Sequence, residues 1–499
     1  MPPPADADAD AARRTDVADR ADALAAAPLL NCLLREVARP HALPDDPRAH
    51  RLPSGRLLRV RGVRRPTAPE VYADGGWHPV GHPELIKLVA EELRLHTGLD
   101  NPELPGEIAD SREAVAALLT ARARVAPPAD PYLLSEQSLV TGHPHHPAPK
   151  ARGGGPAAAW LPYAPEAYAR FPLVLLGLRE DTVVEDGDPA ALDALGEAPP
   201  GYRLLPAHPW QLDLVDLTEP FADGRLIRLG TTGFTAWPTA AIRTVYAPER
   251  DLFLKFSLDV RITNDIRRLW KHDLLRLRAT DDAVVRAFAS GPGAWLSDRG
   301  YRTADFAFEE LAVLVRDGLH AHLGPDETPL LAAGLVEGFP GSPLGAAEDP
   351  AAWWDAYLDA VVPPVLAAFA DHGVVLEAHL QNTLVAVGPD GTPVRALFRD
   401  AEGVKLPSDA DRAAGWERLV YCLVVNHLWE VGAALAEQRP GLDPWPAVRR
   451  ALAAHPLPEI PALLNAPTLP GKTNLLLRWT AADGAAARYH PLPNPLPHP

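Results

Sequence analysis

The chain has 499 residues, of which 47% are hydrophobic, and its formal net charge is -17. This length and composition predict a globular protein of roughly two to four structural units and argue against long disordered tracts. The acidic balance argues against nucleic-acid binding. No apolar run reaches the roughly 18 residues of a membrane span, and no secretion signal is recognisable.

Helical spacing of apolar residues dominates the first quarter of the chain. The first 20 or so residues are predicted to be a disordered lead, after which three segments have helical periodicity: 22–38, 82–98 and 111–126. Between them, "GRLLRVRGVRRP" (55–66) alternates like a short strand pair. The helical pattern breaks at "APPADPY", which predicts a domain boundary near residue 128.

From residue 130 to about 330 the pattern becomes that of a sheet. Short apolar segments bounded by turn residues predict strands at 171–178, 224–233, 240–248, 251–260 and 310–317. Within this region we expect "DLFLKFSL" to form a strand and "RITNDIRRLWKHDLL" (261–275) to form a helix.

From about residue 331 helices return, at 351–373 and 415–438, with a hairpin between them whose turn is "GPDGTP". The Pro-rich tail "HPLPNPLPHP" is expected to be a surface strap or disordered. The predicted fold class is therefore α+β, with a helical part at 1–128, a sheet-rich part with an antiparallel sheet at 129–330 and a mixed part at 331–499. Cys32 and Cys422 are far apart in the sequence, which is typical of buried thiols in a reduced cytoplasm.

The loop "GHPHHPAPKARGG" (142–154) gathers three histidines, Lys150 and Arg152 between glycines and prolines. Proline prevents helix formation and glycine allows close approach of the backbone to a ligand, so the loop could close over phosphates. An exposed basic loop or a weak metal cluster is the alternative. A structural zinc site is disfavoured, because no cysteine assists.

A second cluster of cations lies between residues 239 and 268. The chain contains only six lysines, and Lys255 lies inside the apolar strand "LFLKF". Arg243 lies on a preceding strand that could pair with this one, and Thr263 and Arg267 are four residues apart, on one face of the expected helix. Converging cations need an anion, because unpaired buried charge is costly. Internal pairing with Asp259 and Asp265 is the alternative.

The third cluster is "HGVVLEAHLQN" followed by "FRDAEG". As a strand, this segment would present Glu377, His379 and Gln381 on one face. Asn382 follows, and Asp400 and Glu402 end the next strand. Asn and Asp oxygens suit Mg²⁺ bridging nucleotide phosphates, so the pair Asn382 and Asp400 predicts a metal site. The alternative is an ordinary solvated face. The "GKT" at 471–473 lacks the spacing of a Walker motif.

These segments resemble the IucA/IucC family, the NRPS-independent siderophore synthetases. The resemblance covers about 135–480 and rests on the 142–154 loop, "HPWQ" (208–211), "PTAAIRT", "LKFSLDVRIT", "LEAHLQN", "FRDAEG", "VVNHL" and "GKTNLLLRW". It implies a cradle of thumb, fingers and palm, a homodimer in the cytoplasm, and an ATP-dependent ligase. ATP would activate a citrate-like carboxylic acid as an acyl adenylate, which an amine, hydroxylamine or alcohol would attack.

The resemblance also implies roles for individual residues. Lys255, Arg267 and His379 would be catalytic. The carboxylate substrate would contact Thr263, Arg267 and His379, and Mg²⁺ would contact Asn382 and Asp400. ATP would contact a larger set: His146, Lys150, Arg152, Thr239, Arg243, Lys255, Gln381, Asn382 and Glu402. No nucleic acid or membrane partner is implied.

One departure from the family is Ala241, which stands where relatives commonly have Ser, so a phosphate-binding hydroxyl is missing. Two other functions stay open. A small-molecule kinase is one, because the 374–400 region loosely resembles the catalytic loop and metal-binding Asp of kinases, although Glu377 and His379 stand where a kinase needs an Asp base. A nucleotide-binding protein without ligase activity is the other, suggested by Ala241.

Overall fold

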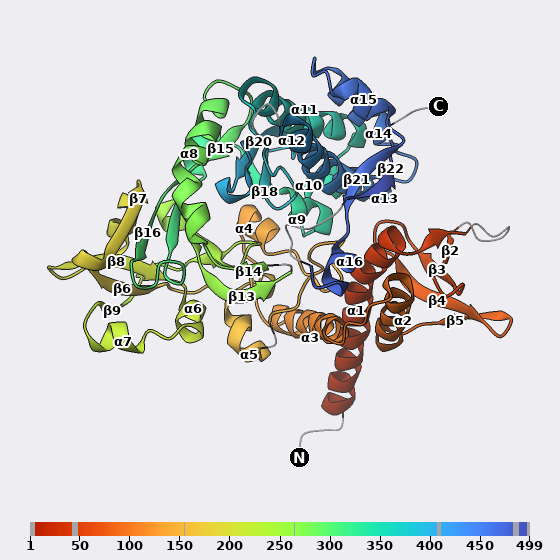
Figure 1. Cartoon of the computed structure of the whole chain (residues 1–499), viewed down its shortest axis with the longest axis horizontal. Helices are drawn as coiled ribbons and strands as arrows, with labels where there is room; N and C mark the ends of the chain where they lie inside the picture. Colours follow the sequence, from red (N-terminus) through yellow and green to blue (C-terminus); the bar gives the residue numbers. More distant parts are fainter. Residues whose placement is uncertain are drawn as a thin grey trace.

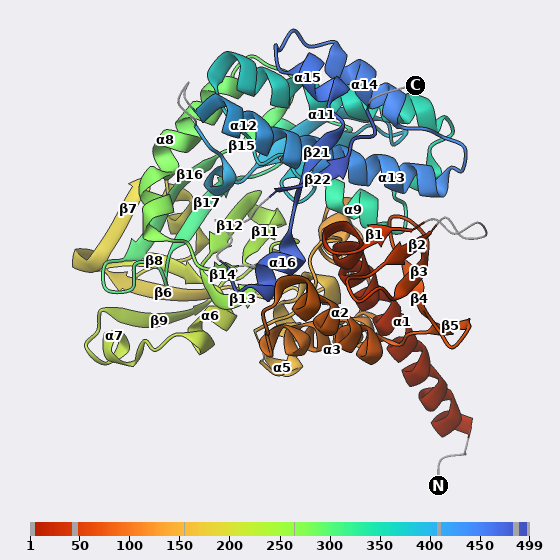
Figure 2. The same cartoon turned by 45° about the vertical axis from the view of Figure 1, so that its right-hand side comes forward.

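The computed structural model describes residues 5–41, 48–153, 155–263, 265–406, 411–482 and 489–496, with side chains from residue 15 on. The chain folds into three groups of elements, as Figures 1 and 2 show. We call them thumb, fingers and palm after the predicted ranges, whose boundaries stay predictions.

The thumb combines three helices with a five-stranded antiparallel sheet of order β1-β2-β3-β4-β5. The three predicted helices are confirmed, but the sequence indicated only one strand pair of this sheet. Helix α1 already begins at Ala5, so the expectation of a disordered lead of about 20 residues is wrong from that residue on. The elements are α1 (Ala5–Glu36), β1 (Arg39–Pro40), β2 (Ala49–Arg51), β3 (Leu57–Arg61), β4 (Thr67–Ala73), β5 (Gly76–Pro79), α2 (His82–Thr97) and α3 (Glu103–Arg122).

The fingers contain a six-stranded sheet of order β10-β11-β12-β17-β16-β7 and a three-stranded sheet of order β8-β6-β9. Their elements begin with α4 (Pro131–Glu136), α5 (Ala157–Trp160), β6 (Val174–Arg179), β7 (Val183–Gly187), β8 (Tyr202–Ala207), α6 (Pro209–Leu214), α7 (Thr218–Ala222) and β9 (Leu226–Thr231). They continue with β10 (Trp237–Pro238), β11 (Thr244–Ala247), β12 (Leu252–Phe256), β13 (Leu258–Ile262), β14 (Asp265–Arg267), α8 (Lys271–Phe288), β15 (Ala294–Leu296), β16 (Asp298–Ala304), β17 (Val313–Asp317) and β18 (Thr328–Leu331).

The predicted helix over 261–275 is wrong for the described residues before Lys271. Strands β13 and β14 form a hairpin in which Ile262 pairs with Asp265, and helix α8 begins only at Lys271. β-branched Ile262 and Ile266 lie in the two strands, whose extended backbone they favour, and Thr263 lies at the turn with a φ of 59°.

The palm packs helices around the four-stranded sheet β15-β20-β19-β18, in which β15 and β20 are parallel. Its further elements are α9 (Ala332–Glu337), α10 (Pro343–Ala346), α11 (Pro350–His372), β19 (Thr383–Val387), β20 (Pro393–Arg399), α12 (Arg412–Leu419), η9 (Val420–Leu428), α13 (Trp429–Gln438), α14 (Trp445–Ala453), α15 (Ile460–Asn465), β21 (Thr468–Lys472), α16 (Asn474–Trp479) and β22 (Tyr489–Pro493). The predicted β19–β20 hairpin is confirmed.

One palm prediction is wrong, and the strap alternative predicted for the tail is confirmed for its described part. Residues 376–382 form a loop with a tight turn rather than a strand, since Asn382 N–H bonds to the His379 carbonyl (3.1 Å). In the tail, β22 pairs with β21 and Leu492 is 5% exposed, so this described part is a packed strap.

Segments α12, η9 and α13 form one continuous helix, Arg412–Gln438, with the length and hydropathy of a membrane span. Within the described chain, 78% of its most apolar window is buried, so it is the central helix of the palm core. The sequence expectation that no segment has these properties therefore did not hold for this helix.

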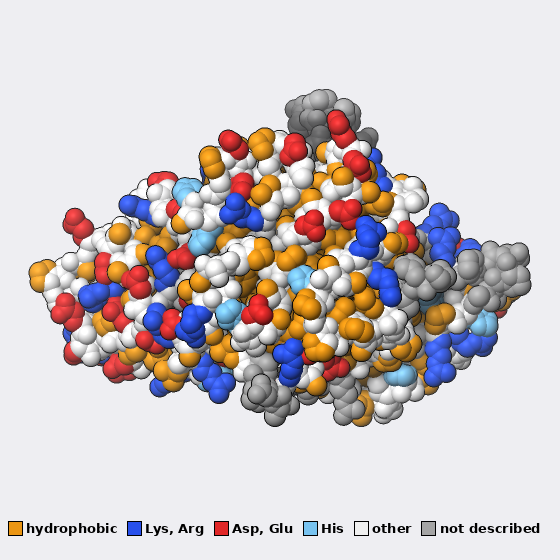
Figure 3. Space-filling model, turned by 90° about the horizontal axis from the view of Figure 1, so that it is seen from above, with side chains coloured by type: hydrophobic (Ala, Val, Ile, Leu, Met, Phe, Trp, Pro, Cys, Tyr) orange, Lys and Arg blue, Asp and Glu red, His pale blue; other side chains and the backbone are white. Residues whose placement is uncertain are grey.

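Figure 3 shows charged side chains gathered toward the two ends of one face, with more hydrophobic and neutral ones between.

Candidate functional site

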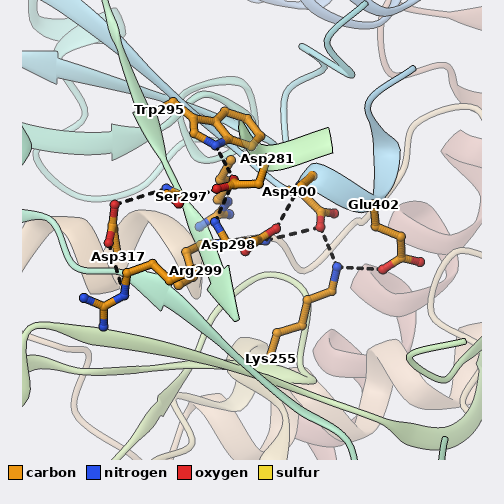
Figure 4. A network of polar contacts seen from close by, with 12 residues as sticks. Lys255, Asp281, Trp295, Ser297, Asp298, Arg299, Asp317, Asp400 and Glu402 are labelled. Atoms are coloured by element: carbon orange, nitrogen blue, oxygen red, sulfur yellow. Dashed lines mark hydrogen bonds and ion pairs between the residues drawn. The ribbon is translucent and has the colours of Figure 1, made fainter. Parts of the chain in front are cut away.

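The cations predicted on the fingers meet the acids predicted on the palm. Strand β11 pairs with β12 so that Thr244 lies opposite Lys255, and the Phe256 amide donates to the Arg243 carbonyl (2.9 Å). The ammonium of Lys255, 3% exposed, donates to Asp400 Oδ1 (2.5 Å) and Glu402 Oε2 (2.7 Å). Figure 4 shows this ammonium between the two carboxylates.

Arg243 completes this group from the neighbouring strand. Its guanidinium donates to Glu402 Oε2 (3.1 Å) and to the carbonyls of Arg267 (3.2 Å) and Arg268 (3.0 Å). The predicted convergence of Arg243 and Lys255 is therefore present. Their acid partners are Asp400 and Glu402, whereas the sequence alternative named Asp259 and Asp265. Asp259 instead holds Arg268 through two bonds of 2.5 Å.

A second group of charged residues, which the sequence did not reveal, contacts Asp400. Arg316 donates to Asp298 Oδ1 (2.7 Å) and to Asp400 Oδ1 (3.2 Å), and Asp298 accepts the Ala401 amide (2.8 Å). Burial alone would raise the pKa of Asp400, but the charges of Lys255 and Arg316 hold it well below its usual value. Asp400 therefore stays ionised.

Arg267 and Thr263 form the other predicted pair, on a hairpin instead of a helix. Arg267 donates to Thr263 Oγ1 (2.7 Å) and to the Ile262 carbonyl (2.8 Å). Burial and the charge of Arg243 lower the pKa of Arg267. Among the residues that the structure describes, Arg267 makes no ion pair, so a half-buried guanidinium lies beside the cluster without its own carboxylate.

The backbone is strained at this site. Eight non-glycine residues in the described chain have positive φ, and three of them are Ile242 (50°), Thr263 (59°) and Asp400 (83°). Positive φ is rare for β-branched residues, and such strain clusters at functional sites. Ile242 is the middle residue of a three-residue turn closed by the Arg243 amide and the Ala241 carbonyl (2.5 Å).

Thr239 closes the other side of this turn. It is fully buried and donates its hydroxyl to the Thr244 carbonyl (2.9 Å), so its role in the structure is to hold the turn that precedes Arg243. Glu136, which sequence reasoning missed, binds the Ala240 amide (3.0 Å) and Arg399 (2.6 Å). It ties the turn to the palm.

Most of the described part of the basic loop, 142–153, is buried, although Gly153 is exposed. Lys150 forms a short ion pair with Glu166, which also accepts from Arg152 (2.9 Å). Burial works to raise the pKa of Glu166, but the two cations lower it to about 2. One carboxylate thus balances two buried cations, and the buried Nε of Arg152 has no hydrogen-bond partner in the described chain. Both features suit an additional anion.

The loop also approaches the palm and the β13–β14 hairpin. A side chain at Gly153 would touch Val260, and burial and the neighbouring charges of His145, His146 and His379 keep the pKa of His143 well below its usual value. His146 is 2% exposed, and its Nδ1 accepts the Ala148 amide (3.1 Å). His146 therefore shapes the loop from within.

The loop before β19 carries the predicted palm residues His379, Gln381 and Asn382. His379 Nδ1 accepts the Gln381 amide (3.3 Å), and the Gln381 carbonyl accepts Arg399 (2.8 Å). The Asn382 carbonyl accepts the Arg399 amide (3.1 Å), so Asn382 and Asp400 lie at the same end of the antiparallel β19–β20 pair. The described chain contains no group of three or more His, Cys, Asp or Glu side chains that could hold a metal.

Sequence reasoning missed Glu136, Glu166, Asp298, Arg316 and Arg399. Arg399 alone carried a local signal, because it directly precedes Asp400. The other four residues are separated in the sequence from the residues they bind, and isolated charged residues form no recognisable motif.

Comparisons with known proteins show which proteins this chain resembles. Residues 131–337 match the IucA / IucC family and residues 351–487 match the family described as ferric iron reductase FhuF-like transporter. The L-2,3-diaminopropanoate--citrate ligase of Staphylococcus aureus is 29% identical over 440 residues, covering 74% of this chain and 75% of that protein. The rhizobactin siderophore biosynthesis protein RhbC of Rhizobium meliloti is 32% identical over 320 residues, 54% of each chain.

Among solved structures, the ATP-bound aerobactin synthetase IucA of Klebsiella pneumoniae superposes with a TM-score of 0.77 at 24% identity, covering 95% of this chain and all of that one. The petrobactin biosynthesis protein AsbB of Bacillus anthracis gives a TM-score of 0.76 at 17% identity, over 96% of each chain. At these identities the superpositions establish the fold.

Proposed function

The chain belongs to the IucA/IucC family, and from that premise we propose that it is an ATP-dependent ligase that joins a citrate-like carboxylic acid to an amine, hydroxylamine or alcohol. The relatives named above include a citrate ligase and a protein of siderophore biosynthesis, which supports this substrate class. The product would be a siderophore or a related metabolite.

One observation carries the proposal: cations outnumber carboxylates at the site. In the fingers–palm group, the buried Arg243, Lys255 and Arg316 and the half-buried Arg267 face the buried Asp298 and the half-buried Asp400 and Glu402. In the loop, Lys150 and Arg152 face only Glu166. A buried excess of positive charge is costly without an anionic ligand. Adenylation brings two anions together, a carboxylate and a triphosphate, and needs such an excess.

In the first step, a carboxylate oxygen of the acid attacks the α-phosphorus of ATP. The bond between the α-phosphorus and the bridging oxygen breaks, and pyrophosphate leaves with the electron pair. We assign Lys255 and Arg243, with Lys150, Arg152 and His146 from the loop, to the phosphates. Thr263, Arg267 and His379 would hold the carboxylate in line. Positioning and charge neutralisation by these residues lower the barrier.

In the second step, the nucleophile attacks the acyl carbon, AMP leaves, and the nucleophile loses one proton. His379 would orient the substrate in this step: the Gln381 amide donates to its Nδ1 (3.3 Å) and Glu377 Oε2 lies 4.0 Å from its Nε2, so both fix the ring, and the proton passes to solvent. The half-buried side chain of Gln381 and the buried Asn382 would line the nucleotide side with Glu402.

The donor set also fits Mg²⁺. Asn382 and Asp400 offer the amide and carboxylate oxygens that this ion prefers, and the ion needs few protein ligands when phosphates supply the rest. When bound, Mg²⁺ would neutralise phosphate charge.

The proposal includes a cytoplasmic homodimer that uses small-molecule substrates, with no nucleic acid or membrane partner. Cys32 and Cys422 are buried and unbonded, which fits a reducing compartment.

The test is one incubation of the purified protein with ATP, Mg²⁺, hydroxylamine and a panel of carboxylic acids, read by mass spectrometry. AMP, pyrophosphate and a hydroxamate from one acid are the expected products. ADP would instead indicate a kinase. ATP binding without turnover on any acid would indicate a binding protein, and Ala241→Ser would then test whether the missing hydroxyl is the cause.

A further inference from the structure

A buried ion pair between Glu136 and Arg399 joins the fingers to the palm, and neither side chain is more than 4% exposed. Glu136 Oε1 accepts Arg399 Nη1 (2.6 Å) and the Tyr132 hydroxyl (2.9 Å). Its Oε2 accepts Arg399 Nη2 (3.2 Å) and the Ala240 amide (3.0 Å). Four donors thus fill the four acceptor positions of the carboxylate, and one acid balances one cation. Unlike the cation group, this pair has no excess charge to offer a substrate.

The ion pair contacts three segments that carry assigned site residues. Ala240, whose amide the carboxylate holds, lies in the turn that leads to Arg243. The Gln381 carbonyl accepts both Nε (3.2 Å) and Nη2 (2.8 Å) of Arg399. Arg399 is also the residue directly before Asp400. The pair therefore connects the phosphate-binding turn of the fingers with the two palm segments assigned to the nucleotide and Mg²⁺.

Helix α4, which ends at Glu136, is itself held on two sides. Gln137, the next residue, donates its side-chain amide to the Pro238 carbonyl (3.0 Å), two residues before the turn contact of Glu136. On the side of the palm sheet, the Leu331 amide donates to Ser135 Oγ (2.9 Å), and Figure 1 shows α4 beside α9. The carboxylate therefore starts from a backbone that is fixed to both parts of the molecule.

Geometry rather than stability explains an ion pair in this place. The desolvation of two buried charges offsets most of their attraction, so a buried pair adds little to stability. The fork of an arginine, however, fixes a carboxylate in one orientation. ATP has to meet the cations of the fingers and the oxygens of the palm at the same time, and a misplacement of about 1 Å can slow such a reaction about a hundredfold.

We propose that Glu136 is a positioning residue: together with Arg399 it sets the distance between the cation Arg243 and the palm oxygens of Asn382 and Asp400. The inference rests on the proposed function, because the groups that it positions are those assigned to ATP and Mg²⁺. Glu136 itself touches no substrate, so its effect falls on the rate of adenylation rather than on the affinity for ATP.

The test measures AMP formation by the full-length protein with ATP, Mg²⁺, hydroxylamine and citrate. Glu136→Asp keeps the charge and withdraws the carboxylate by one methylene group. We expect this variant to lower kcat at least about tenfold and to change the KM for ATP less than about threefold. Glu136→Gln, which also removes the charge, should lower kcat at least about a hundredfold.

Glu185→Asp is the matched control. Glu185 is likewise the acid partner of a fully buried arginine, Arg302, but it lies in β7 and contacts no assigned site residue in the described chain. Its substitution should leave kcat and the KM for ATP within about twofold of the wild type. Urea unfolding of each variant measures the loss of stability separately, and the rates are compared at a temperature at which the variants are folded.

A folded Glu136→Asp variant with the wild-type kcat would overturn the inference and leave the ligase proposal standing. A raised KM for ATP with an unchanged kcat would overturn it as well, and so would a fall in kcat no larger than that of Glu185→Asp. If Glu136→Gln does not fold, Glu136→Asp decides the question. No AMP formation by the wild type would overturn the proposed function and this inference with it.

Discussion

Lys255 illustrates what a single charged residue does in this protein. Its ammonium lies between Asp400 and Glu402 at 2.5 and 2.7 Å, and it is 3% exposed. Without an anionic substrate it is neutralised by two acids, and an incoming phosphate would compete with them for the same donor. Lys255 therefore has two structural partners, Asp400 and Glu402, and one assigned functional partner, the phosphate of the substrate.

Lys255→Met should lower the rate of AMP formation by at least about a hundredfold, because it removes a phosphate donor and leaves two carboxylates facing the phosphates. It should also lower the unfolding midpoint, since buried acids lose their partner. Lys271→Met is the control, an exposed lysine expected to leave both properties unchanged. Wild-type AMP formation in Lys255→Met would contradict the assigned phosphate site.

Arg267 tests the other half of the site. Arg267→Ala should raise the KM for the carboxylic acid at least about tenfold and change the Kd for ATP less than about threefold, because the guanidinium is held on the hairpin by Thr263 and has no acid partner in the described chain. Arg268→Ala, which removes the ion pair with Asp259, is the control. Equal losses in acid use and ATP binding would contradict the assignment.

Glu166 gives a prediction for pH. Its pKa is lowered to about 2 from 4.5, so the folded protein binds fewer protons than the unfolded chain in this window. Its stabilisation is therefore complete above pH 4.5 and is lost as the pH falls toward 2; a shift of this size corresponds to about 3 kcal/mol.

The stability difference between wild type and Glu166→Gln, from urea unfolding, should therefore shrink as the pH falls through this window. The exposed Glu113 provides a control, because Glu113→Gln should give a small difference at every pH. A difference for Glu166→Gln that stays constant from pH 6 to pH 3 would show that the ion pairs of Glu166 do not stabilise the fold.

At the scale of elements, the π-helical segment η9 contacts the loop 377–382 that carries His379. π-helical turns are rare and frequent at functional sites, and this one directs His427 inward. The buried ring bonds to the Ala378 carbonyl through Nδ1 (2.9 Å) and to the Tyr357 hydroxyl through Nε2 (2.6 Å). Burial lowers the pKa of His427 to about 4, so the ring is neutral and the Nδ1 proton holds the residue next to His379.

We predict that His427 is a positioning residue. His427→Leu should raise the KM for the carboxylic acid several-fold by releasing the 377–382 loop, whereas His427→Asn, whose amide can still donate to Ala378, should restore most of the affinity. Tyr357→Phe should leave the KM unchanged. If all three variants lose stability equally and keep the wild-type KM, the contact is structural only.

At the scale of the whole molecule, the end of the described chain returns to its beginning. Helix α16 packs into the thumb core, where Trp479 is 3% exposed and donates to Thr97 Oγ1 (3.0 Å). Glu36 of α1 accepts the amides of Leu475 (3.0 Å) and Leu476 (2.9 Å) at the start of α16. The loop 142–154 joins the same junction, since Asn474 donates to the His145 carbonyl (2.6 Å). The thumb, the basic loop and the C-terminal helix α16 therefore pack together.

This junction predicts that Trp479→Ala destabilises the protein by about 3–5 kcal/mol, the usual cost of a large cavity in a core. The free energy of unfolding from urea titration provides the measurement. Trp77→Ala at the half-buried sheet edge is the control and should cost much less. Equal effects of the two substitutions would show that α16 contributes little to the thumb core.

The sequence by itself determined many of the local elements, and it predicted a chemistry for the site. Periodicity predicted the thumb helices, the strand of Lys255 and the hairpin before Asp400, because side-chain burial repeats along an isolated element. Residue types alone indicated cations for phosphates and oxygens for Mg²⁺. Only the tertiary structure decided which acids pair with which cations: Lys255 meets Asp400 across 145 residues, and Arg399 meets Glu136 across 263. It also decided the hairpin of Thr263 and the loop of His379, where packing and backbone strain outweighed spacing. Such contacts depend on how sheets and helices pack against one another, and this packing produces no periodic pattern in the amino-acid sequence.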